Sequence, residues 1–186
     1  MSVDYAKVYE LLDSVTPMRM DCGQFCNAAC CQIDQYSETV GIYLMNGEET
    51  MHDQSDEWLS WQKQDRDESG YPESWPQDIW FVRCHGPGKC KRNLRPVQCR
   101  TFPCWPYLSK DGKLSIAMLD VELPYVCPLI ENSDSINPAF FHALYDGWKL
   151  LIEDQANYDM VYQDSRFSDE SGIPPVIVYS PEEVSE

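Results

Sequence analysis

The chain reads DCGQFCNAACCQ at residues 21–32 and CHGPGKCKRNLRPVQCRTFPC at residues 84–104. These two stretches contain eight of its nine cysteines, and Cys127 is the ninth. Nine thiols cannot all pair as disulfides within one chain. The N-terminal residues carry acids and have neither a basic start nor a continuous apolar run, which predicts a cytoplasmic protein without a signal peptide. In a reducing compartment, clustered cysteines are typical of metal ligands or redox groups.

The spacing within the first stretch favours chelation of a metal. Cys22, Cys26 and Cys30 recur every four residues, and in a helix they would lie along one face. Cys31 follows Cys30 directly, and adjacent cysteines rarely reach the same tetrahedral ion. This pair therefore serves two separate centres, or one of its members supports a site without binding the metal.

The second stretch has the composition of a metal-binding turn. The residues Gly-Pro-Gly at 86–88 give a tight turn between Cys84 and Cys90, so that both thiolates can converge on one ion. His85 is adjacent to Cys84, and a surface role fits it better than ligation. Nine thiols gathered in two places are hard to explain as small buried apolar residues, which is the alternative.

The charge of the chain restricts its partners. A formal net charge of -17 disfavours binding to nucleic acid or to an anionic membrane, and no apolar run approaches the ~20 residues of a membrane-spanning helix. Residues 79–110 contain no acid and seven of the fourteen basic residues. We interpret this basic segment, in particular Arg95 and Arg100, as support for nearby thiolates through charge and hydrogen bonds. A solvated basic face is the alternative.

The remaining sequence predicts an α+β fold, irregular and cysteine-rich. We expect a single metal-binding domain at 1–163, with its cysteine-rich core at 20–130 and an acidic insertion or lid at 48–78, and an acidic tail at 164–186. The expected elements are an N-terminal helix at 3–15, a strand at 39–45, a helical segment at 55–64, a strand at 79–83, a hairpin of 104–109 with 113–119, a helix from Asn137-Pro138 to about 155 and an edge strand at 176–179.

With these residues assembled, the chain resembles the YkgJ-type family of zinc- or iron-chelating proteins, named for a CxxCxxCC signature. The matching segments are CGQFCNAACC at 22–31, GIYLMNGEE at 41–49, CHGPGKC at 84–90, RPVQCRTFP at 95–103 and Cys-Pro at 127–128. The first motif is CxxxCxxxCC here, which is wider than the signature. The resemblance implies eight metal ligands and leaves Cys104 as a spare thiol: Cys22, Cys26, Cys30, Cys31, Cys84, Cys90, Cys99 and Cys127.

Eight thiolates suffice for two four-thiolate centres, or for one cluster and one structural ion. Zinc bound by four thiolates would be structural, and an iron-sulfur cluster would permit electron transfer. The sequence does not distinguish zinc from an iron-sulfur cluster. Because Cys30 and Cys31 cannot easily share an ion, we expect the two cysteine stretches to meet in space, with at least one centre drawing ligands from both.

Two other functions are open at this point. The first is a metal-dependent or redox enzyme related to the flagellin lysine methylases that contain the YkgJ-type module, with Glu48 or Glu49 as base and the arginines as an anion clamp. Capping of a turn, or plain solvation, is the simpler account of both acids. The second is an adaptor that binds a protein partner through the tryptophans of the insertion: Trp58, Trp61, Trp75 and Trp80.

Overall fold

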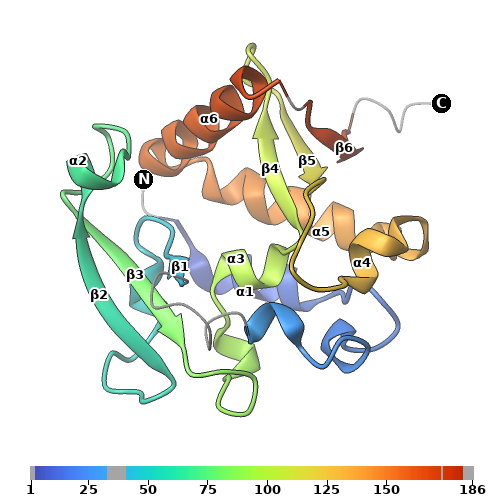
Figure 1. Cartoon of the computed structure of the whole chain (residues 1–186). Coiled ribbons are helices and arrows are strands. Elements are labelled where there is room, and N and C mark those ends of the chain that lie inside the picture. Colours follow the sequence, from blue (N-terminus) through green and yellow to red (C-terminus); the bar gives the residue numbers. More distant parts are fainter. Residues whose placement is uncertain (1–2, 33–40, 173, 182–186) are drawn as a thin grey trace.

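The structure, a computed structural model, describes residues 3–32, 41–172 and 174–181 of the chain. It combines helices with two separate antiparallel sheets of three strands each, which confirms mixed helix and sheet. Figure 1 shows the first sheet as an arm at one side of the molecule, while the second lies beside the two long C-terminal helices. The first cysteine stretch lies at one end of the molecule, and the turn of the hairpin formed by residues 104–118 lies at the opposite end.

The first sheet contains β1 (Ile42–Tyr43), β2 (Leu59–Asp65) and β3 (Asp78–Cys84). β3 lies in the middle and pairs antiparallel with both neighbours. The strand expected at this position is confirmed, and its Val82 is fully buried. Because β3 ends at Cys84, that thiol lies at the end of the central strand.

The helical segment expected at 55–64 is wrong. Most of it belongs to β2, whose seven residues pair with all seven of β3. Leu59 is buried and Trp61 half-buried on one face of the strand, while Ser60 and Gln62 on the other face are exposed. Pairing with a buried central strand satisfies the backbone and overrides a weak local preference for helix.

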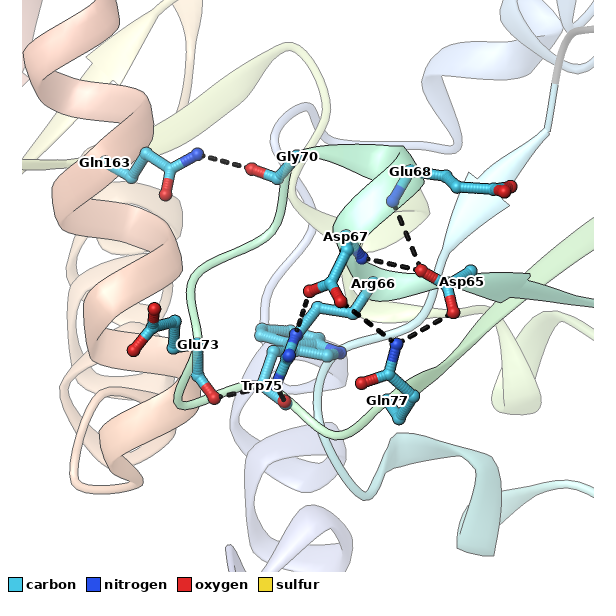
Figure 2. A network of polar contacts seen from close by, with 9 residues as sticks. All are labelled: Asp65, Arg66, Asp67, Glu68, Gly70, Glu73, Trp75, Gln77 and Gln163. Atoms are coloured by element: carbon cyan, nitrogen blue, oxygen red, sulfur yellow. Dashed lines mark hydrogen bonds and ion pairs between the residues drawn. The ribbon is translucent and has the colours of Figure 1, made fainter.

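The rest of the insertion is held by a polar network, shown in Figure 2. Asp65 caps the short helix α2 (Arg66–Ser69) by accepting hydrogen bonds from two of its backbone N–H groups. Arg66 donates to two carbonyl groups of the turn that follows. Gln163 donates to the Gly70 carbonyl at 2.6 Å and so ties this turn to a C-terminal helix. The insertion is therefore more ordered than its composition suggests.

The second sheet contains β4 (Cys104–Leu108), β5 (Leu114–Met118) and β6 (Val176–Tyr179). β5 is central and pairs antiparallel with both others. Gly112 takes a φ of +80° in the turn between β4 and β5, a conformation that glycine adopts without steric cost. The expected hairpin and edge strand are both confirmed.

Two helices from opposite ends of the chain pack together in the main core. They are α1 (Tyr5–Asp13) and α5 (Pro138–Leu151), both close to their expected positions. Asn137 caps α5 by accepting a hydrogen bond from the Ala139 N–H, as expected. A Cβ atom at Gly147 would lie 3.0 Å from Leu12, so the missing side chain permits the close approach of the helices.

A third long helix, α6 (Gln155–Glu170), was not expected. The preceding helix ends at Leu151, and Asp154 caps α6 by accepting a hydrogen bond from the Asn157 N–H. The helix continues across residue 163, so the residues that we assigned to an acidic tail begin inside α6. Within the described ranges, no helix has both the length and the apolar character needed to cross a bilayer.

Candidate metal centre

The first cysteine stretch folds as two 3₁₀ turns, Cys22–Gln24 and Ala29–Cys31. Asn27 and Ala28 between them have φ angles of 52° and 53°, in the left-handed region. A continuous right-handed helix requires negative φ at these positions. The single helical face considered for these cysteines therefore does not form, and the thiols are distributed around a compact loop.

The adjacent residues Cys30 and Cys31 belong to different groups of thiols. Their Sγ atoms are 3.9 Å apart, within hydrogen-bonding distance for sulfur. Beyond this contact, Cys30 interacts electrostatically with Cys22 and Cys26. Cys31 interacts instead with Cys90 of the second stretch. The vicinal pair is thus the point at which two groups of thiols meet.

The first group of thiols consists of Cys22, Cys26, Cys30 and Cys127. Cys26 Sγ lies 3.8 Å from the Cys22 carbonyl oxygen. Burial and the Asp21 carboxylate raise the pKa of Cys22, and the thiols of Cys26 and Cys127 raise it further. Cys127 directly precedes the short helix α4 (Pro128–Glu131). Cys127, about a hundred positions along the chain, therefore lies near Cys22, and it is also a neighbour of Cys104.

The second group of thiols consists of Cys31, Cys84, Cys90 and Cys99. Cys84, at the end of β3, donates to the Gly86 carbonyl at 3.8 Å, and its interaction with the Cys90 thiol raises its pKa. Cys99 lies on the short helix α3 (Val97–Thr101), where burial first, and then the Cys31 thiol, raise its pKa to about 12. This group draws on both cysteine stretches. The two stretches therefore lie close together at Cys31 and Cys99, while a metal centre that draws ligands from both stays a prediction.

Two arginines, Arg92 and Arg95, lie close to the thiols. Arg92 forms an ion pair of 2.5 Å with Asp21, which links the second stretch to the start of the first. Hydrogen bonds from neighbouring thiols are the main cause that lowers the pKa of Cys31 and of Cys90 to about 7. Arg95 and Arg92 act in the same direction through their charge. The environment therefore favours the thiolate form, which binds metals, at Cys31 and Cys90, whereas the pKa values of Cys22, Cys30, Cys84 and Cys99 are raised.

Arg100, which we grouped with Arg95 from the sequence, is buried and turned into the protein. Its Nε donates to the Arg95 carbonyl at 2.5 Å, and its Nη2 donates to the Asn93 carbonyl at 2.8 Å. Its Nη1 pairs with Asp13, and its guanidinium carbon lies 4.0 Å from the centre of the Tyr9 ring. Arg100 thus holds the loop that carries Arg95.

Glu48 is fully buried and not exposed at a turn. Its role as a buried hydrogen-bond acceptor was not predicted from the sequence. Its Oε1 accepts hydrogen bonds from Tyr9 Oη at 2.8 Å and from Val97 N at 2.6 Å. Its Oε2 accepts one from Met45 N at 2.9 Å. Burial raises the pKa of the Glu48 carboxyl, and these hydrogen bonds oppose the shift. Since Val97 begins α3, Glu48 fixes the helix that carries Cys99.

Cys104 lies apart from most of the other thiols. It is on β4, 4% exposed, within the main apolar core. Burial, and then the neighbouring Cys127 thiol, raise the pKa of Cys104 to about 12. That Cys104 does not bind a metal stays a prediction.

The histidines lie outside both groups of thiols. His85 is exposed, and its Nε2 lies 2.7 Å from Ser60 Oγ, which agrees with a surface role. His52 is buried between the rings of Trp58 and Trp61. Burial lowers the pKa of His52 to about 4, so its imidazole is neutral in the folded protein.

The eight thiols gather without forming a closed coordination shell. Across the described residues, no group of three or more His, Cys, Asp or Glu side chains is arranged to hold a metal ion as it stands. The donor chemistry nevertheless fits zinc or an iron-sulfur cluster, since each takes four thiolates. Comparisons with family models, curated proteins and solved structures find no match for the chain. The resemblance to YkgJ-type proteins therefore stays a prediction.

Proposed function

We propose that this chain is a cysteine-ligated metal-binding protein with two adjacent four-thiolate centres. The observation that carries the proposal is that Cys30 interacts with Cys22 and Cys26, whereas the adjacent Cys31 interacts with Cys90 and Cys99. One centre would be held by Cys22, Cys26, Cys30 and Cys127. The other would be held by Cys31, Cys84, Cys90 and Cys99.

The surroundings of the thiols support the proposal. Four thiolates around a divalent ion leave a net negative charge, and so do four thiolates around a cluster. Arg95 interacts electrostatically with thiols of both groups, among them Cys22 and Cys99, and so can offset that charge. Zinc would supply a structural link between distant segments, and an iron-sulfur cluster would supply electron transfer. The resemblance to YkgJ-type zinc- or iron-chelating proteins points the same way.

The side chains give less support to an enzyme that uses Glu48 as its base. Both carboxylate oxygens of Glu48 already accept hydrogen bonds from the protein, and the group has no exposed surface. A general base must reach its substrate directly or through one water. Glu49 is half-buried and lies outside both groups of thiols. Metal binding therefore ranks ahead of this catalytic alternative.

The adaptor function is also less well supported. Trp58 and Trp75 are buried, at 5% and 4% exposure. Trp61 and Trp80 pack against each other with ring centroids 5.5 Å apart. These tryptophans therefore stabilise the insertion itself and present little free aromatic surface to a partner.

Protein purified without oxygen is expected to contain about two metal centres per chain, because each group of thiols has the four donors that zinc or a cluster needs. Elemental analysis measures the stoichiometry. An absorption spectrum distinguishes the two chemistries, since an iron-sulfur cluster is brown and zinc is colourless. Metal-free protein that keeps its full thermal stability with all thiols free would contradict the proposal.

A further inference from the structure

A cavity of about 230 Å³ is lined by residues of α3, β4 and α6, and by Tyr71 and Trp75 of the insertion. Its wall includes a row of aromatic rings, in which Tyr43 lies 5.6 Å from Tyr71, and Tyr71 lies 4.9 Å from Trp75, between ring centroids. Trp105 and Trp148 also line it. A cavity below the ~300–1,000 Å³ of drug-sized sites fits a ligand of only a few heavy atoms.

The cavity has a negative group and no positive one. Asp164 of α6 lines it, and none of the described residues in its wall is basic. Asp164 makes neither a hydrogen bond nor an ion pair with any other described part of the chain. Asp164 is exposed to solvent, and partial desolvation by its neighbours raises the pKa of its carboxyl to about 6. No basic residue in the described wall offsets its charge.

The cavity wall is firmly built. Trp75 belongs to the turn that Arg66 holds by its carbonyl groups, and Gln163 fixes Gly70, the residue before Tyr71 (Figure 2). Gln163 directly precedes Asp164 on α6. The aromatic rings and the carboxylate are thus held relative to each other by the same contacts.

We propose that this cavity binds a small methylated ammonium compound. Aromatic faces attract a cation, most strongly where water is excluded. The Asp164 carboxylate, which no basic residue of the wall offsets, adds a second attraction. A primary ammonium would need acceptors for three N–H groups, whereas a methylated one needs none. This site is independent of the proposed metal centres.

Choline is the probe for this proposal, and 3,3-dimethyl-1-butanol is its neutral isostere. Titration of the full chain, followed by tryptophan fluorescence and calorimetry, is expected to show saturable binding of choline and binding of the isostere at least about fivefold weaker. Asp164→Asn should weaken choline binding about tenfold and leave the isostere unaffected. Glu170→Gln, the same change of charge on the same helix, should alter neither.

Three outcomes would overturn the proposal. They are the absence of saturable choline binding, equal binding of choline and its isostere, and full choline affinity in Asp164→Asn. Circular dichroism of Asp164→Asn confirms that a loss of binding does not reflect unfolding. Metal content, measured on the same samples, reports on the thiol centres separately, so a failure at this cavity leaves their test intact.

Discussion

Replacing Cys99 with alanine is expected to remove about half of the bound metal, whereas replacing Cys104 is expected to remove none. Cys99 lies on α3 with the thiols of Cys31 and Cys90 as electrostatic neighbours. A four-thiolate site that keeps three ligands loses much of its affinity, and a structural zinc site contributes ~10 kcal/mol or more in total. Cys104 is a core residue of β4 beside Cys127, and so serves as the matched control.

Double variants make this test specific for two centres. Cys31→Ala combined with Cys99→Ala affects one group of thiols only, so the pair should lose no more metal than either single variant. Cys30→Ala combined with Cys99→Ala affects both groups and should lose nearly all of the metal. Elemental analysis after gel filtration measures the content. Equal losses in Cys99→Ala and Cys104→Ala would show that the spare thiol is misassigned, and equal losses in the two double variants would contradict two separate centres.

Elements with local signals were predictable from the sequence. Asn137 with Pro138 marks the start of α5, and Asp111-Gly112 marks the β4–β5 turn, because caps and turns depend on residues adjacent in the chain. The helix α6 was missed because polar residues interrupt its apolar spacing. Asp154, which caps it, was the available signal. β2 was missed because its stability comes from pairing with β3, which is a contact between distant residues.

The candidate site shows the same division. The different thiol neighbours of Cys30 and Cys31 could be predicted, because adjacent cysteines rarely reach the same ion. Thiolate chemistry also indicates the kind of ligand that these residues suit, which is zinc or an iron-sulfur cluster. The assignment of Cys127 to one group and Cys84 to the other depends on the path of the chain between them. The burial of Glu48 had no local signal either. Its three donors come from α1, from the segment after β1 and from the start of α3.

Replacing Glu48 with alanine is expected to lower the free energy of unfolding by at least about 3 kcal/mol, because three buried donors lose their acceptor. These are the Oη of Tyr9 and the backbone N–H groups of Met45 and Val97. Urea denaturation of the metal-loaded protein measures the loss. Glu49→Ala, at the half-buried neighbouring acid, is the control and should stay within about 0.5 kcal/mol.

Glu48→Gln refines the prediction, since the two carboxylate oxygens have different partners. An amide whose oxygen takes the place of Oε1 keeps the hydrogen bonds from Tyr9 and Val97. Its NH₂ group then faces the Met45 N–H, so one hydrogen bond is lost and two donors oppose each other. A loss of about 1–2 kcal/mol is expected, intermediate between the wild type and Glu48→Ala. If Glu48→Ala cost no more than Glu49→Ala, the carboxylate would not be the acceptor that joins α1, the segment after β1 and α3.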